Sequence, residues 1–197
     1  MALWRPVRAL SLALLLACGG ALAQPQLVLS VAVVILEGSG WTGERARGAL
    51  REAGTILSQC AIALEAAAPL ELRVPPDLLD FSTAAARDLA RAHPVARPAA
   101  YFVRDTKSRP AFEAEAIGRG NSATRPEIAD TVWMTASVRD PGVALAHELV
   151  HVLMDSGEHS DEEGNLMRDE TSRQNRRLST AQCARLRDTA KANGMLR

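Results

Sequence analysis

The sequence of 197 residues predicts a single α/β or α+β domain built on a mixed, twisted sheet. Three observations predict it: a strongly apolar strand-like segment near the N-terminus, a long helix-like segment after it, and several strand-like segments before two further helices. Lys+Arg and Asp+Glu both total 23, so the sequence indicates no basic surface of the kind that binds nucleic acid.

The first 23 residues have the order of a secretory signal peptide. Arg5 and Arg8 precede an apolar run at residues 9–17, and a stretch of small residues ends at Ala23. The apolar run is shorter than the roughly 20 residues that a membrane-spanning helix needs. We therefore expect residues 1–23 to be removed on export to the periplasm or the medium.

A second interpretation of the N-terminus involves Cys18. The sequence Leu-Ala-Cys-Gly around this residue looks like a bacterial lipobox, so the signal would end before Cys18 and the protein would be a lipid-anchored envelope protein. An association with the membrane is expected only in this case. Under the first interpretation the mature protein is residues 24–197, which we expect to form one domain.

The first element of that domain is a strand at residues 27–36, which are almost all apolar and rich in Val, as in a strand buried on both faces. Apolar residues then recur at spacings of three and four from Ala46 to Leu64. This spacing places them on one face of a long helix that is expected to begin near Thr42. Cys60 lies on the same apolar face.

Shorter elements are expected in the middle of the chain. Apolar and charged residues alternate from Leu70 to Val74, which predicts a short strand. A short helix is expected at residues 83–92, before Pro94. Further strands are expected at residues 99–103, 112–118 and 131–135.

A second long helix is predicted to begin at Pro141. Asp140 is a good N-cap, and proline is favoured at the first helical position. Leu149 and Leu153 lie on one apolar face of this helix, and we expect Gly157 to end it.

The last predicted helix opens on a capping box made by Ser179 and Gln182 and ends near Gly194. Its apolar face carries Cys183. Since Cys60 also lies on an apolar helix face, both thiols are expected to point into the core. In an oxidising compartment they are expected to form a disulfide, with two separate buried thiols as the alternative.

The helix from Pro141 also carries the residue types of a metal site, in the order His147-Glu148-Leu149-Val150-His151. Residues four apart lie on one face of a helix, so the two imidazoles can bind one metal ion. Glu148 can reach a water molecule that zinc activates, and can take its proton during attack on a peptide carbonyl. The spacing is a zinc metallopeptidase signature; the alternative is two histidines on a partly buried helix without a metal.

A catalytic zinc ion takes three protein ligands and keeps one position open for water. We expect His159 to be the third ligand, because a turn at Gly157 lets the chain fold back toward the helix. Glu170 is the alternative, since a glutamate completes the site in another branch of peptidases with this signature. No helix is predicted that would present Glu170 to the metal.

The block from His147 to Met167 resembles the metzincin clan of zinc metallopeptidases, and within it the matrixins. These proteins have a His-Glu-x-x-His helix, a glycine, a third histidine and a methionine-containing turn. The resemblance implies a zincin-like fold, one Zn²⁺ ion, and Met167 packed under the metal without binding it. It also implies an edge strand within residues 114–120 that pairs with extended substrate. The spacing between His151 and His159 is longer than is usual in the family, so a longer turn is expected.

The predicted function is therefore zinc-dependent hydrolysis of peptide bonds in proteins or peptides. Zinc would polarise the scissile carbonyl, while Glu148 acts as general base and then as proton donor to the leaving amine. The alternative is a non-catalytic zinc-binding or partner-binding protein of the envelope. Glu148 argues against it, because a structural zinc site needs no general base and usually closes its fourth position with a protein ligand.

Overall fold

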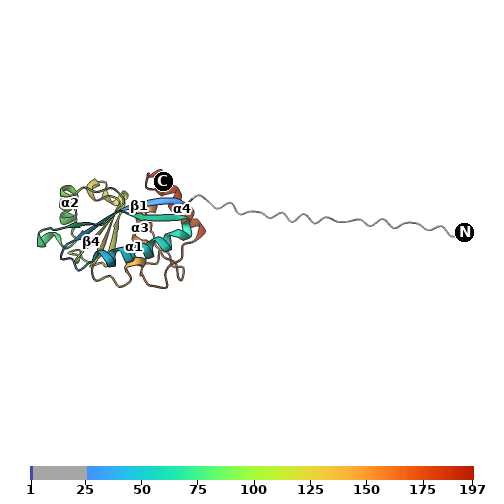
Figure 1. Ribbon diagram of the computed structural model, residues 1–197, viewed down its shortest axis with the longest axis horizontal. Coiled ribbons are helices and arrows are strands. Elements are labelled where there is room, and N and C mark those ends of the chain that lie inside the picture. Colours follow the sequence, from blue (N-terminus) through green and yellow to red (C-terminus); the bar gives the residue numbers. More distant parts are fainter. Residues whose placement is uncertain (2–25) are drawn as a thin grey trace.

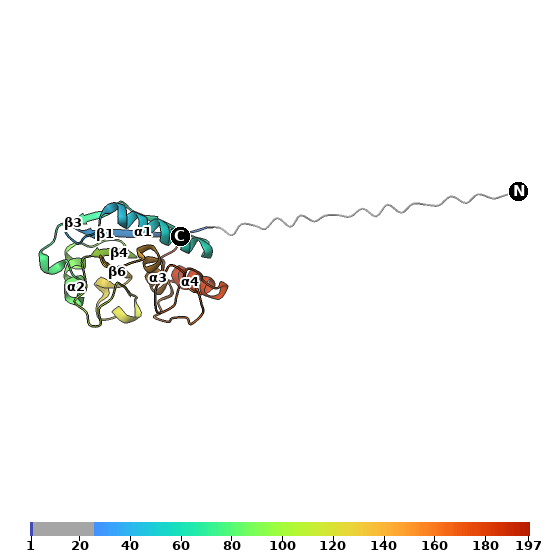
Figure 2. The same ribbon diagram turned by 90° about the horizontal axis from the view of Figure 1, so that it is seen from below.

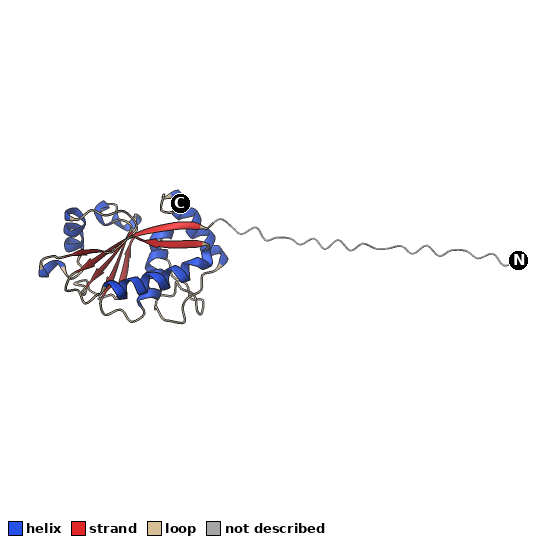
Figure 3. Cartoon of the chain, in the orientation of Figure 1, coloured by secondary structure: helices blue, strands red, loops and turns tan. Residues whose placement is uncertain are grey.

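The computed structural model describes residues 26–197, together with Met1, as one twisted sheet covered by helices on both faces (Figures 1 and 3). The predicted signal peptide and Cys18 lie outside the described residues, apart from Met1. No helix in residues 26–197 is long and apolar enough to cross a membrane. The predicted fold class, an α/β domain on a mixed sheet, is confirmed.

The sheet has six strands, and its main path runs β2-β1-β4-β6-β5. In chain order the strands are β1 (Leu27–Leu36), β2 (Ile62–Ala66), β3 (Leu70–Leu72), β4 (Ala99–Val103), β5 (Ala114–Ile117) and β6 (Thr131–Thr135). The strand β1 pairs in parallel with β2, β3 and β4, and β4 pairs in parallel with β6. Only β5 is antiparallel to its neighbour, and it forms one edge of the main path among the described strands.

Within residues 26–197, four α-helices flank the sheet: α1 (Gly43–Leu57), α2 (Thr83–Ala92), α3 (Pro141–Met154) and α4 (Thr180–Ala192). Four short 3-10 helices lie between them: η1 (Ser58–Cys60), η2 (Pro76–Leu78), η3 (Gly120–Ser122) and η4 (Pro126–Ile128). Helices α1, α3 and α4 contribute to the larger hydrophobic core on one face of the sheet, and α2 contributes to the smaller core on the other. Burial on both faces explains why β1 and β4 read as continuous apolar runs.

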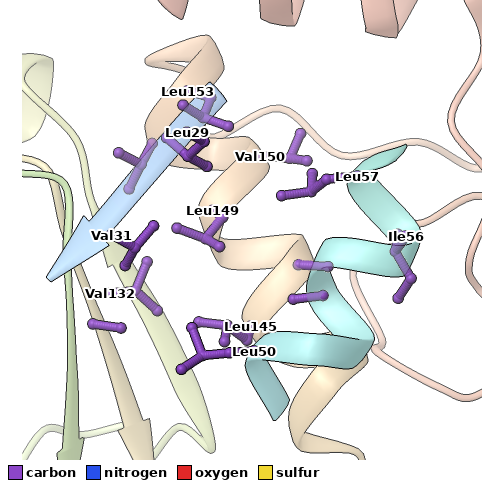
Figure 4. Packing of buried hydrophobic residues seen from close by; sticks show 14 of the residues in the cluster. Leu29, Val31, Leu50, Ile56, Leu57, Val132, Leu145, Leu149, Val150 and Leu153 are labelled. Atoms are coloured by element: carbon purple, nitrogen blue, oxygen red, sulfur yellow. The ribbon is translucent and has the colours of Figure 1, made fainter. Parts of the chain in front are cut away.

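Packing in the larger core holds α3 in place between the sheet and α1 (Figure 4). Leu145 and Leu149 of α3 lie beside Val132 of β6 and Leu50 of α1, and all four side chains are at least 96% buried. Near the start of α3, Gly142 leaves room for the side chain of Glu52 on α1, because a Cβ atom at this position would overlap it. The helix that carries the metal-site motif is therefore held along its length by apolar contacts.

The structure corrects the predicted end of the first long helix. Helix α1 ends at Leu57, and Ala61 then takes a left-handed conformation with φ of 56°. The chain turns there into β2, so Leu64, which was placed on the helix face, belongs to a strand parallel to β1. A spacing of three from Ala61 to Leu64 fits a helix, while Ile62 and Leu64 also fit the alternation of a strand. Main-chain pairing with β1 decides between these two patterns.

Residues at the C-terminal end return to the start of β1 (Figure 2). The main-chain N–H of Val28 donates to the carbonyl of Arg197 at 2.9 Å, and the N–H of Arg197 donates to the carbonyl of Val28 at 3.1 Å. The guanidinium of Arg197 also donates to the hydroxyl of Ser30 at 2.6 Å. The segment after α4 therefore extends the pairing of β1 in the antiparallel sense.

The disulfide predicted between Cys60 and Cys183 is present, and it joins η1 to α4 with a Cα–Cα distance of 4.9 Å. Both residues are buried in the larger core. The bond confirms that the two thiols meet, although Cys60 lies on η1 and not on α1.

We expect removal of this bond to lower the free energy of unfolding by about 5 kcal/mol, since the sequence separation of 123 residues makes the closed loop long. Urea denaturation of the wild type and of Cys60→Ala/Cys183→Ala, with and without reductant, measures the loss. The double variant should behave alike in both conditions. Equal midpoints for the oxidised wild type and the double variant would contradict this expectation.

Candidate metal centre

Three histidines converge at one end of a cleft. His147 and His151 lie one turn apart on α3, and His159 comes from the loop after it. The Nε2 atom of His151 lies 2.9 Å from Nε2 of His147 and 3.3 Å from Nε2 of His159. With Zn–N distances of about 2.0–2.1 Å, the nitrogen ligands of a tetrahedral zinc ion are about 3.3–3.4 Å apart. The separation of His151 and His159 matches this spacing, that of His147 and His151 is shorter, and all three ligand atoms lie within 4.8 Å of one another, so the three imidazoles can share one metal ion.

Main-chain carbonyl groups orient the two helical histidines. The Nδ1 atom of His147 lies 2.8 Å from the carbonyl oxygen of Leu166, and Nδ1 of His151 lies 2.7 Å from that of Ser156. A carbonyl can only accept, so each Nδ1 carries the proton and each Nε2 is left as the free ligand atom. His159 differs, because its Nδ1 lies 3.6 Å from a carboxylate oxygen of Asp169.

The turn that brings His159 to the helix begins earlier than predicted. Helix α3 ends at Met154, and Asp155 adopts the left-handed conformation with φ of 44° that was expected of Gly157. The carboxylate of Asp155 accepts a hydrogen bond from the main-chain N–H of Gly120 at 3.1 Å. This bond to the segment after β5 compensates for a non-glycine residue in a strained conformation. The prediction of Gly157 as the helix stop was therefore wrong by two residues.

Burial keeps the helical histidines neutral at physiological pH. It lowers the pKa of His147 to about 4, which the hydrogen bond to Leu166 opposes in part and the neighbouring imidazoles reinforce. Burial also lowers the pKa of His151, again against the effect of its carbonyl partner. Neutral imidazole is the form that binds metal ions, so both side chains are ready to act as ligands.

Glu148 lies beside the histidines and is only 7% exposed. The pKa of its carboxyl is raised to about 8, chiefly by burial and also by the nearby charge of Glu115, while a hydrogen bond from the main-chain N–H of Ala116 acts in the opposite direction. A bound dication would favour the ionised carboxylate. The side chain is therefore a titratable group held away from bulk water and next to the metal position.

The cleft above these side chains has a volume of about 540 Å³ and runs between β5 on one side and α3 with its following loop on the other. The carbonyl of Glu113 accepts from the N–H of Thr135 at 2.9 Å. Because hydrogen-bonded pairs alternate along an antiparallel ladder, the main-chain groups of Ala114 and Ala116 point away from β6. The expected edge strand within residues 114–120 is thus present beside the site.

Two further predicted residues, Met167 and Glu170, are placed differently with respect to the histidines. Met167 is 1% exposed, and its carbonyl accepts a hydrogen bond from the N–H of Ser160, next to His159, at 2.7 Å. The ligand atoms of the three histidines all lie within 4.8 Å of one another. Glu170 lines the cleft but does not belong to this group. The geometry thus brings His159 to the helical pair and leaves Glu170 outside it, while the ligand roles stay predictions.

Sequence reasoning missed several groups that surround the histidines. The carbonyls of Leu166 and Ser156 carry no signal in the sequence, because every residue has a carbonyl. Asn165 is a polar residue that is only 2% exposed. Its position two residues before Met167 was the available sequence signal, but the metal-site motif does not include it. Asp169 and Glu115 also approach the site from outside the motif.

Solved structures that share the fold include two metalloproteinases. Metalloproteinase-II from Bacteroides fragilis matches with a TM-score of 0.59 and 17% sequence identity, over 83% of this chain and 53% of that chain. Archaemetzincin from Methanopyrus kandleri matches with a TM-score of 0.52 and 12% identity, over 83% of this chain and 96% of that chain. The present chain thus spans about half the length of the Bacteroides protein. In sequence, the chain matches no protein-family model and no curated protein.

Proposed function

We propose that this protein is a zinc-dependent endopeptidase of the metzincin clan, with a matrixin-like site and a lengthened turn before its third histidine. The observation that carries the proposal is the convergence of three imidazole Nε2 atoms beside the buried carboxyl of Glu148, at the floor of an open cleft. A fold shared with two metalloproteinases supports the proposal.

Each group has a separate task in this proposal. His147, His151 and His159 hold one Zn²⁺ ion, which when bound polarises the scissile carbonyl and lowers the pKa of a water molecule. Glu148 accepts the proton of the attacking water molecule and then donates it to the leaving amine. Met167 packs under the metal and supports the ligands without binding it.

The substrate is a protein or peptide in an extended conformation. The outward-facing N–H and carbonyl groups of Ala114 and the carbonyl of Ala116 bind its main chain as an added strand, while the N–H of Ala116 is held by Glu148. The cleft is open and 540 Å³ in volume, so internal segments of a chain can enter it. This fits endopeptidase activity.

We also propose that residues 1–23 direct export and that residues 24–197 form one catalytic domain. The disulfide between Cys60 and Cys183 supports an oxidising compartment such as the periplasm or the medium. A lipid anchor at Cys18 remains the alternative for retention in the envelope.

Purified protein carrying one zinc ion should cleave unfolded protein and internal bonds of a peptide library, and a chelator should stop the reaction. Removal of the metal takes away the Lewis acid while the disulfide and the core stay intact. Zinc added back to chelated protein should restore cleavage, and mass spectrometry of the fragments identifies the cut sites. Zinc-loaded protein that cleaves nothing would favour a non-catalytic zinc-binding or partner-binding role.

The same digest should show a preference for Lys and Arg over Asp and Glu near the scissile bond. The described side chains that line the cleft include one guanidinium, Arg139, against five carboxylates besides Glu148: Glu113, Glu115, Asp155, Asp169 and Glu170. Opposite charges raise the local concentration of substrate, and salt screens this effect. Raising ionic strength should therefore reduce the preference. Equal cleavage of acidic and basic peptides at low salt would contradict it.

A further inference from the structure

We propose that Asn165, held by Gln182, is a positioning residue that couples the start of α4 to the metal centre. The inference rests on the proposed zinc site and goes beyond it, because no role assigned above uses the side chain of Asn165. It concerns the geometry of the histidines and not the chemistry of the reaction.

The side chain of Asn165 is buried and fully hydrogen-bonded. Its Oδ1 atom accepts from the main-chain N–H of Met167 at 2.9 Å and from Nε2 of Gln182 at 3.2 Å. Its Nδ2 atom donates to Oε1 of Gln182 at 2.9 Å and to a carboxylate oxygen of Glu162 at 3.2 Å. A buried amide with all its partners in place specifies one arrangement, because each lost partner would leave a costly unsatisfied group.

From Asn165, main-chain contacts lead to two of the three histidines. The next residue, Leu166, presents the carbonyl that orients His147. The residue after that, Met167, has its N–H held by Asn165, and its carbonyl accepts from the N–H next to His159. Asn165 therefore holds the short segment Leu166–Met167. This segment positions both the carbonyl that orients His147 and the carbonyl that binds Ser160, next to His159.

On its other side, Asn165 is connected to α4. Gln182 closes the capping box of this helix with Ser179, and its Oε1 atom accepts from both the N–H of Ser179 and the side chain of Asn165. The next residue, Cys183, is bonded to Cys60 on η1. The capping box and the disulfide thus fix the start of α4, and through Gln182 they fix Asn165 and the segment Leu166–Met167 that it holds.

An outer-shell partner of a metal-binding histidine typically contributes about 10–100-fold to metal affinity. Asn165 acts on His147 through the carbonyl of Leu166, so we expect the lower end of this range: Asn165→Leu, whose side chain has a similar size but makes no hydrogen bonds, should weaken zinc binding about 10-fold in competition with a chromophoric chelator. The visible spectrum of the Co²⁺-substituted protein should also change, since His147 loses its fixed orientation. Gln182→Met keeps the hydrogen bond that the N–H of Met167 donates to Oδ1 of Asn165, and should give a smaller loss.

The matched control is Ser82→Ala, which removes the N-cap hydrogen bond of α2 on the opposite face of the sheet. It should lower the melting temperature but leave the zinc affinity and the Co²⁺ spectrum of the wild type unchanged. If Asn165→Leu does not fold, Gln182→Met and Asn165→Asp carry the test, and a weakened affinity in either supports the inference.

Folded Asn165 and Gln182 variants with wild-type affinity and spectrum would overturn the inference and leave the proposed function standing. An equal loss of affinity in Ser82→Ala would also overturn it, because the effect would then follow stability alone. Wild-type protein that binds no zinc would instead contradict the proposed function, and this inference with it.

Discussion

Replacing Glu148 with glutamine should abolish hydrolysis while one zinc ion stays bound. The amide has the size of the carboxyl group, so it fits the same buried position beside Ala116, but it cannot accept a proton from water. General acid–base catalysis contributes about 10²–10⁴-fold to a rate, so kcat should fall by at least about 100-fold. A fluorogenic peptide measures kcat, and elemental analysis of the same sample measures the zinc content.

The control for this variant is Glu44→Gln, which makes the same chemical change at an exposed position in the first turn of α1. It should retain the wild-type kcat and zinc content. Loss of zinc together with activity in Glu148→Gln would mean that Glu148 is a metal ligand, and the role of general base would be wrong.

His159→Ala should greatly reduce zinc occupancy, whereas Glu170→Ala should leave it nearly unchanged. Loss of a direct ligand leaves two imidazoles, and its effect should exceed the roughly 10–100-fold loss typical of outer-shell partners. The side chain of Glu170 lies outside the histidine group. The main-chain carbonyl of Glu170, which the substitution keeps, accepts a hydrogen bond from the side chain of Asn175 at 2.9 Å. Its substitution should therefore leave the ligand set intact.

Dialysis of both variants against a zinc-buffered chelator, followed by elemental analysis, decides between the two ligands. Circular dichroism before and after dialysis checks that each variant is folded. The reverse pattern, with zinc lost from Glu170→Ala and retained in His159→Ala, would contradict the proposed matrixin-like ligand set.

The elements best predicted from the sequence were those with one unambiguous pattern. The strands at residues 99–103 and 131–135 and the helix at residues 83–92 have the bounds that the sequence analysis gave them. They are short apolar runs or a short amphipathic helix, each bounded by turn-forming residues. The end of α1 was wrong, and β2 was missed, because local periodicity cannot show that a segment pairs with β1 far away in sequence.

The site shows the same division between side-chain signals and main-chain contacts. His147 and His151 were recognisable because their spacing of four residues on a helix is itself the geometry of a metal site. The groups that orient them are the main-chain carbonyls of Leu166 and Ser156, which both come after the end of α3. Only folding of the chain brings these carbonyls next to the histidines. The same holds for Asn165, whose partner Gln182 was read only as a helix cap.

The return of Arg197 to Val28 has a consequence for how the protein is made. The two residues that exchange main-chain hydrogen bonds are almost a full chain length apart, and the disulfide also joins distant segments. Contacts of such high sequence separation form slowly, because closing so long a loop costs chain entropy before the contact stabilises the fold. The N-terminal strand therefore completes its pairing only after the C-terminal segment has been synthesised.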